Sequence, residues 1–231
     1  MTSRAAPRFQ GISMFRSLKH VLACLTVALL PLAGAHAQAV PGATIQVTDL
    51  ANRSVRIPAK VDRILLGEGR LLPAIAVFDR QDPARRLVGM MGEFEKLDEP
   101  GYAQWKTQFP QIDKVPRVGR TNSGSFSDEQ AIALRPQVAI FGISGGHGPS
   151  ERDRETLARL EAAGVAIVFI DFRHDPLKNT TRSMEVLGEV LGQRKEAEAF
   201  NTYWKQQLDL VTQRLAAKKP VAPTVFLENR V

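Results

Sequence analysis

The stretch SDEQAIALRPQVAIFGISGGHG, residues 127–148, combines several signals that decide the fold. A short helical pattern over 127–134 leads through Arg135-Pro136 into the apolar run QVAIFG at 137–142. A glycine-rich loop with one serine and one histidine follows that run. The order helix, buried strand and loop is typical of an α/β domain whose functional groups follow its strands.

Similar apolar runs recur along the chain, each short, rich in Val, Ile or Leu, and ending in glycine or a polar loop. They are RILLG at 63–67, RLVGM at 86–90, QVAIFG at 137–142 and VAIVFID at 165–171. Helical patterns lie between them at about 70–80, 98–107, 127–134 and 150–163. The last pattern begins with a capping box formed by Ser150 and Asp153. Strands that alternate with helices predict a mostly parallel sheet flanked by helices.

The segments on either side of this alternation have other patterns. TIQVTDLANRSVRIP at 44–58 predicts a β-hairpin, because Asn52 tolerates a left-handed backbone at its turn. Beyond Asp175, one amphipathic helix is interrupted by Gly192, and a second runs over about 195–217. At ~1.5 Å per residue the second helix is roughly 35 Å long. A strand pattern, TVFLENRV, closes the chain.

The first 39 residues have the pattern of a signal peptide. Arg16 and Lys19 precede an apolar segment over 21–30, and small residues lead to a cleavage site near Ala39, with Met1 or Met14 as the start. The apolar segment is too short to remain as a membrane anchor. The one cysteine, Cys24, lies inside it, so the mature chain is expected to lack disulfides, a thiol nucleophile and thiolate metal ligands.

The charge of the mature chain gives no reason to invoke nucleic acid. The whole sequence of 231 residues has a formal net charge of +7, from 31 basic and 24 acidic residues. Four of the basic residues and none of the acidic ones precede position 40, which leaves +3. That balance is ordinary for a protein surface.

The glycine-rich loop allows three chemical interpretations. Gly142 to Gly146 fits the G-x-S-x-G nucleophile elbow of an exported α/β-hydrolase using Ser144, but the next helix is expected to begin only near Ser150. A dinucleotide cradle needs a glycine spacing that this loop lacks. A metal site built on His147 and His174 would need carboxylates to complete it.

A ligand cleft accounts for several loops together. Ligands of open parallel sheets bind beyond the carboxyl ends of the strands, and here those ends carry cationic and hydrogen-bonding side chains that suit an anionic chelate. The candidate ligand-binding residues are Glu68, Arg70, Arg120, Ser123, Ser125, His147, Arg173 and His174.

Nearly all of the mature chain resembles the periplasmic substrate-binding proteins of ABC importers for iron–siderophores, haem and cobalamin. The resemblance rests on the order and spacing of several motifs: VTDLANRSVRIP, RILLGEGR, FPQIDKVPRVGR, SDEQAIALRPQVAIFG, LEAAGVAIVFIDF and SMEVLGEVLGQRKEAEAF. It implies two α/β lobes joined by a long helix, a ligand held between the lobes, and no covalent chemistry. The glycine usual in the first hairpin is replaced here by Asn52.

The resemblance also implies an organisation and partners for this chain. Its segments are a signal peptide (1–39), an N-terminal lobe (40–174), helices that include the connector (175–219), and the first strand of a second lobe that is otherwise missing (220–231). The expected protein is a periplasmic monomer that carries an Fe(III)–siderophore-type chelate, or alternatively haem or cobalamin. It would need no cofactor and would deliver its ligand to an inner-membrane permease, with Glu129 as the docking residue.

Overall fold

The computed structural model describes residues 42–143 and 146–218, together with Thr224. The expected signal peptide and its Cys24, the loop residue Ser144, and all but Thr224 of the expected final strand lie outside the described residues. Among the helices that are described, none combines the length and the apolar character needed to cross a membrane.

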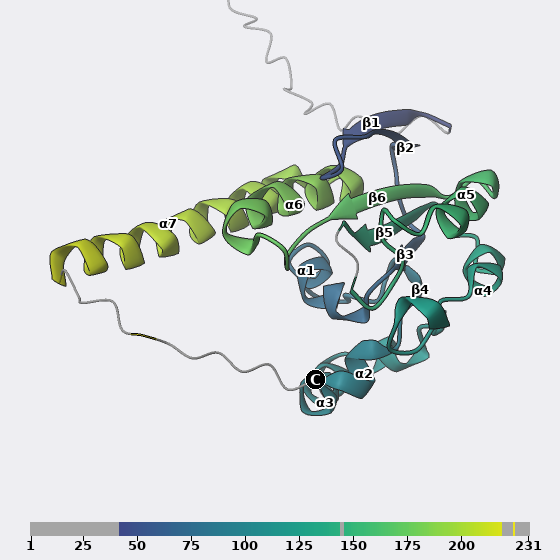
Figure 1. Ribbon diagram of the computed structural model, residues 1–231, viewed down its shortest axis with the longest axis horizontal. Coiled ribbons are helices and arrows are strands. Elements are labelled where there is room, and N and C mark those ends of the chain that lie inside the picture. The colour runs from purple at the N-terminus through teal and green to yellow at the C-terminus, as the bar shows by residue number, and fades with distance from the viewer. Residues whose placement is uncertain (1–41, 144–145, 219–223, 225–231) are drawn as a thin grey trace, which may run out of the picture. The chain divides into compact units, whose positions relative to one another are not determined.

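The described chain alternates strands and helices, as Figure 1 shows. Its strands are β1 (Thr44–Thr48), β2 (Ser54–Pro58), β3 (Ile64–Leu66), β4 (Leu87–Met90), β5 (Val138–Gly142) and β6 (Ala166–Ile170). Its α-helices are α1 (Leu72–Ala76), α2 (Glu93–Leu97), α3 (Glu99–Gln108), α4 (Asp128–Ala133), α5 (Arg154–Ala162), α6 (Pro176–Leu191) and α7 (Arg194–Lys218). Three 3₁₀ turns are η1 (Gly69–Leu71), η2 (Pro110–Lys114) and η3 (Ser123–Ser125).

The four central strands form a parallel sheet in the order β4-β3-β5-β6, which confirms the fold predicted from the apolar runs. From β3 the chain crosses to β4 on one side and later returns to β5 on the other side. The loops that leave β3 and β5 therefore diverge. Such a reversal of strand order opens a crevice at the carboxyl ends of the strands, where α/β proteins bind ligands.

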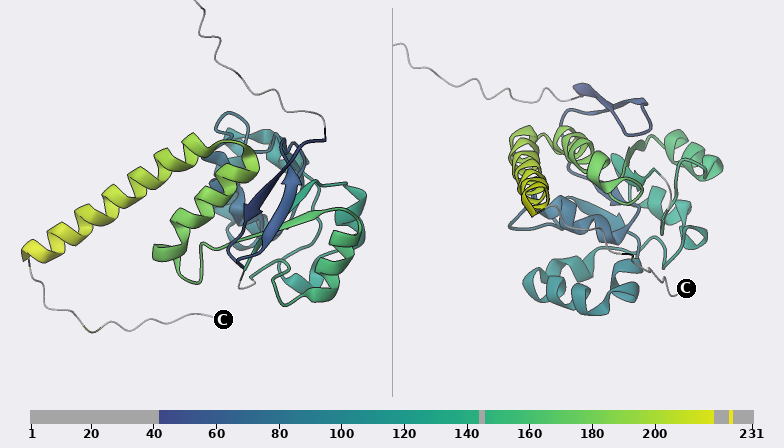
Figure 2. Two further views of the ribbon diagram at one scale, coloured as in Figure 1. Left: turned by 90° about the horizontal axis from the view of Figure 1, so that it is seen from above. Right: turned by 60° about the vertical axis from the view of Figure 1, so that its left-hand side comes forward.

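Both faces of the parallel sheet are buried, which explains why its strands read as continuous apolar runs. One core joins alternate strand residues to α1, α3, α6 and the start of α7; it includes Ile64, Leu66, Val138, Ile140, Val168 and Ile170. The other joins the intervening residues to α4 and α5; it includes Leu65, Ala139, Phe141, Ile167 and Phe169. Figure 2 shows the two groups of helices on opposite sides of the sheet.

The predicted hairpin is confirmed, with β1 and β2 paired antiparallel. Asn52 has φ 58°, so it takes the left-handed conformation expected of it at the turn. The Asp49 carboxylate closes that turn by accepting the backbone N–H groups of Ala51 and Arg53 at 3.0 Å each. The Arg53 guanidinium also donates to the Ile167 carbonyl at 2.8 Å, which ties the hairpin to β6.

Two helices differ in extent from those expected, and one helix was not expected. The pattern at 70–80 yields only η1 and the short α1. Helix α5 begins at Arg154 rather than at Ser150, because Asp153 accepts the backbone N–H and hydroxyl of Ser150 in a turn before the helix. Helix α2 was not predicted, since five residues are too few to show a period.

The long amphipathic helix is confirmed as α7, which follows α6 after Gly192 in a left-handed conformation at φ 68°. Its 25 residues correspond to roughly 37 Å at ~1.5 Å per residue. Ala197 and Asn201 near its start are buried. Val211 and Leu215 on its later turns are each 54% exposed, although their positions continue the same apolar pattern.

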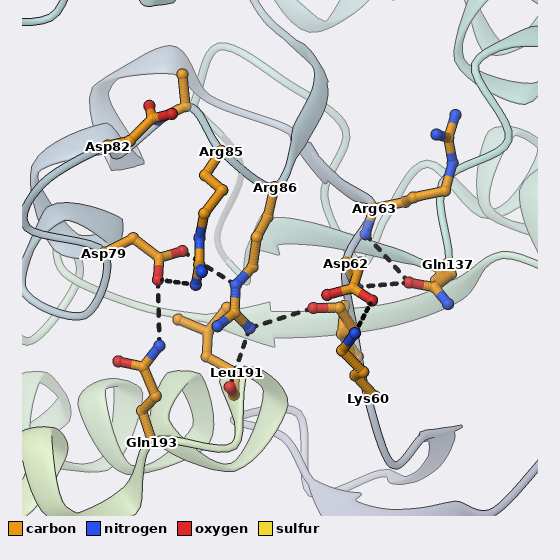
Figure 3. A network of polar contacts seen from close by, with 12 residues as sticks. Lys60, Asp62, Arg63, Asp79, Asp82, Arg85, Arg86, Gln137, Leu191 and Gln193 are labelled. Atoms are coloured by element: carbon orange, nitrogen blue, oxygen red, sulfur yellow. Dashed lines mark hydrogen bonds and ion pairs between the residues drawn. The ribbon is translucent and has the colours of Figure 1, made fainter. Parts of the chain in front are cut away.

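A polar network holds the turn between α6 and α7 against the amino-terminal end of the sheet (Figure 3). Arg86, just before β4, donates to the carbonyls of Val61 and Leu191 at 3.2 and 2.9 Å. The buried Asp79 carboxylate pairs with Arg86 at 3.1 Å and accepts the Gln193 side-chain amide at 3.1 Å. These contacts anchor α7 at the edge opposite the loops that were predicted to bind a ligand.

Candidate functional site

A cleft of about 550 Å³ opens at the carboxyl ends of β3, β5 and β6, where the strand order reverses. The loops after these strands form one wall, and α1, α6 and α7 form the other. The lining residues are Glu68, Arg70, Leu71, Pro73, Ala74, Val77, Gly142, Ile170, Asp171, Phe172, Arg173, Pro176, Thr180, Met184, Phe200 and Trp204. An apolar cleft with a few convergent charged groups is typical of a small-molecule site.

An ion pair joins two of the loops at this cleft. The Arg173 guanidinium donates to Glu68 Oε2 at 2.7 Å, which connects the loop after β6 to the loop after β3. The Glu68 side chain is 8% exposed, whereas that of Arg173 is 49% exposed. The cation therefore faces the cleft while its carboxylate lies beneath the surface.

A second carboxylate, Glu93 at the start of α2, lies close to Glu68. It is fully buried, and its Oε1 accepts the backbone N–H of Arg70 at 2.9 Å. Its Oε2 has no hydrogen-bond partner among the described residues. Burial raises the pKa of the Glu68 carboxyl; the Arg173 guanidinium opposes that shift, and the charge of Glu93 adds to it.

Asp171 shapes the loop that carries Arg173. Its carboxylate accepts the backbone N–H groups of Arg173, His174 and Asp175 and the side-chain amide of Asn179, at 2.8–3.1 Å. Burial raises the pKa of Asp171, but these hydrogen bonds outweigh it and lower that pKa to about 2. Asp171 thus fixes the backbone from which Arg173 reaches the cleft.

Aromatic side chains of α7 line the cleft. Phe200 and Trp204 stack with ring centroids 6.3 Å apart and an interplanar angle of 13°. The indole Nε1 of Trp204 is buried and has no hydrogen-bond partner within the described part of the chain. A buried donor without a partner carries a free-energy cost.

The structure brings four of the eight sequence-predicted ligand residues together. Glu68, Arg70 and Arg173 line the cleft, and His147 lies near enough to Glu68 to affect its ionisation. His147 Nδ1 also makes a 2.7 Å contact with the Thr121 carbonyl, which links its loop to the 118–127 segment.

The other four lie away from the cleft lining. Arg120 and Ser123 are exposed, and Ser125 is used locally: its hydroxyl accepts the backbone N–H of Arg120 at 2.8 Å and donates to the Asn122 carbonyl at 2.7 Å. His174 is also exposed. These side chains share the edge of the sheet but do not converge with the ion pair.

The docking candidate Glu129 lies in the first turn of α4 and is exposed. The neighbouring Asp128 is engaged instead, in an ion pair with Arg159 of α5. Glu129 is therefore presented to solvent on a helix whose position is fixed by its neighbours.

The local geometry bears on the hydrolase and metal alternatives. Helix α5 begins ten residues after Ser144, so it does not present its amino terminus directly behind that residue as a nucleophile elbow requires. The Asp171 carboxylate is occupied by donors of its own loop and of Asn179. Within the described ranges, no three His, Cys, Asp or Glu side chains gather closely enough to hold a metal ion.

The fold matches solved structures of periplasmic binding proteins. A TroA-like periplasmic binding protein, FepB from Veillonella parvula, superposes with a TM-score of 0.65 at 21% identity, covering 74% of this chain and 49% of that one. This chain has the TroA-like fold. A periplasmic solute binding protein from the same species gives a TM-score of 0.62 at 21% identity, covering 75% of this chain and 49% of that one.

A third match is the molybdate periplasmic binding protein MolA of a Haemophilus influenzae ABC transporter, with molybdate bound. Its TM-score is 0.60 at 19% identity, covering 74% of this chain and 54% of that one. The chain thus spans about half the length of the solved structures it matches. No protein-family model and no curated protein matches the chain.

Proposed function

We propose that this chain is the solute-capturing component of an ABC importer, that it works in the periplasm, and that its ligand is an iron–siderophore-type chelate. It binds and delivers the chelate without covalent chemistry. The observation that carries the proposal is the cleft at the strand-order reversal, where an aromatic wall faces Arg70 and Arg173 in a TroA-like fold.

The lining of the cleft supports an organic chelate over a compact oxyanion. A bare oxyanion needs only a small cage of donors, whereas this cleft of about 550 Å³ offers the stacked rings of Phe200 and Trp204 beside its cations. Aromatic walls suit ligands with flat or apolar surface, and guanidinium groups suit their carboxylates or other anionic arms.

Delivery to a permease requires a surface that stays exposed when the ligand is bound. Glu129 on α4 meets that requirement, since it lies outside the cleft lining and its side chain faces solvent. We therefore assign it the docking role that the sequence resemblance implied.

The proposal is tested by calorimetric titration of the chain with ferric catecholate, ferric hydroxamate and ferric citrate chelates, alongside haem, cobalamin and molybdate. We expect saturable binding of at least one ferric chelate, weakened about tenfold or more by Arg173→Gln, because a charge-assisted contact contributes roughly 1.5–3 kcal/mol. Arg120→Gln is the matched control, since Arg120 lies outside the cleft lining. Binding of molybdate alone, or of none of these ligands, would overturn the proposal.

A further inference from the structure

Arg173, the cleft cation best placed to receive an anionic ligand group, is already paired with the Glu68 carboxylate. We infer that binding of an anionic ligand group at Arg173 is coupled to the uptake of one proton by Glu68. This inference rests on the proposed function and adds a regulation to the same site.

The geometry of the pair is the first argument. Arg173 reaches Glu68 through Nη2 alone, and this is the one side-chain partner recorded for its guanidinium among the described residues. The Arg173 side chain is half exposed, and Arg173 lines the cleft. A ligand anion can therefore approach Arg173 from the open side, while the Glu68 carboxylate remains beside it.

The charges that face Glu68 are the second argument. They come from each element around it: Arg70 of η1, Glu93 of α2, His147 of the loop after β5, and Arg173 of the loop after β6. Glu93 is fully buried, and one of its oxygens lacks a hydrogen-bond partner in the described part of the chain. It therefore does not stabilise a second negative charge on Glu68. A ligand anion would add a third negative charge to this group.

Crowding above the pair is the third argument. A Cβ atom placed on Gly146 would lie 2.6 Å from Glu68 Oε1 and 2.5 Å from Arg173 Nη1, so Gly146 packs directly against the ion pair. The Glu68 side chain is only 8% exposed, so little water contacts its carboxylate to screen the repulsion. Protonation of Glu68 removes one negative charge and leaves Arg173 with its full positive charge for the ligand.

The coupling predicts a pH dependence that a permanently ionised probe can reveal. Naphthalenesulfonate has an aromatic surface for Phe200 and Trp204 and a sulfonate for Arg173, and it does not titrate near neutral pH. Its affinity for the full chain is measured by calorimetry at pH 5 and pH 7.5. We expect binding about tenfold tighter at pH 5, because uptake of one proton changes affinity by up to tenfold per pH unit.

Two variants test whether Glu68 or His147 takes up the proton. Glu68→Gln should bind the sulfonate at pH 7.5 as tightly as the unmodified chain does at pH 5, and should lose most of the pH dependence. His147→Gln should keep that dependence. Loss of the dependence in His147→Gln, with retention in Glu68→Gln, would assign the proton to His147 and overturn the inference.

A direct proton count does not depend on any variant. Titrations of the unmodified chain at pH 6.5, repeated in two buffers of different ionisation enthalpy, give the number of protons taken up on binding. We expect a value between 0.5 and 1 proton, since linkage equates proton uptake with the pH slope of affinity. No proton uptake, or no binding of the sulfonate, would overturn the inference. If the sulfonate binds with the expected pH dependence but no ferric chelate binds, only the ligand class proposed above would be refuted.

Discussion

The guanidinium of Arg86 donates a 2.9 Å hydrogen bond to the carbonyl of Leu191, the last residue of α6, across 105 positions of sequence. It also pairs with Asp79, whose side chain is 3% exposed. Replacement by Arg86→Met would leave the buried carboxylate with the exposed Arg85 as its remaining cationic partner, beside the neutral Gln193 amide. We expect a loss of about 3 kcal/mol in the free energy of unfolding, measured by urea denaturation.

The control for this prediction is Lys60→Met. Lys60 and Asp62 pair at 3.0 Å, but their side chains are 73% and 56% exposed, so the pair contributes at most about 0.5 kcal/mol. Equal effects of the two substitutions would contradict the anchoring role of Arg86.

The loop that presents Arg173 depends on Asp171. In Asp171→Asn the carboxylate oxygens no longer accept all four N–H groups, so we expect a loss of about 2 kcal/mol in stability at pH 7. Asp175→Asn is the matched control, because Asp175 is exposed and its side chain makes only a 3.4 Å cap contact with Lys178. A smaller effect at position 171 than at 175 would count against the prediction.

The lowered pKa of Asp171 also predicts how the free energy of unfolding changes at acid pH. The folded-state pKa of Asp171, about 2, lies below its ordinary value of 3.8, so its contribution is present above pH 4 and is lost as the pH falls from about 4 toward 2. Urea denaturation across this range should show a smaller decline for Asp171→Asn than for the unmodified chain. Parallel declines in the two proteins would contradict the assignment.

Arg135 adopts φ 49° just after the end of α4. This left-handed conformation costs free energy for a residue that has a Cβ atom. We expect Arg135→Gly to raise the unfolding free energy by about 0.5 kcal/mol, after allowance for the larger backbone entropy of glycine. Ala133→Gly, two residues earlier and inside the helix, should lower it by about 1 kcal/mol. The same sign for both substitutions in thermal melts would refute this explanation.

The exposed position of Glu129 predicts a separation of binding from transport. Glu129→Arg should leave chelate affinity unchanged within twofold, because the residue lies outside the cleft lining. It should reduce permease-dependent uptake by about tenfold or more, since the substitution reverses the charge that the docking proposal places against the permease. Unchanged uptake with this variant would remove Glu129 from the docking surface.

The sheet and its strand directions could be predicted because each strand is buried on both faces and therefore appears as an uninterrupted apolar run. Asn52 was recognisable as a turn residue for a similarly local reason, the tolerance of asparagine for positive φ. The start of α5 was misplaced because the Ser150–Asp153 hydrogen bonds form in a turn that has the same sequence spacing as a capping box.

The site was less predictable, because tertiary contacts decide which polar loop residues converge. Arg120 follows a short run that the structure pairs with β4 only through an isolated bridge at Arg117, whereas Arg173 follows β6 and meets Glu68. Phe200 and Trp204 were not predicted to be ligand residues, because both fit the apolar stripe of α7. Glu93 was missed as well, since a buried carboxylate on a five-residue helix leaves no pattern in the sequence.

The central claim, capture of a ferric chelate in the cleft beside α7, is tested most directly by the fluorescence of Trp204. In a Trp105→Phe background, Trp204 is the one remaining tryptophan, and its ring lines the cleft. Titration with ferric catecholate, hydroxamate and citrate chelates should give saturable quenching with at least one of them. The quenching should weaken about tenfold or more when Arg173 is also replaced by glutamine. Absence of saturable quenching with all three chelates would contradict the account.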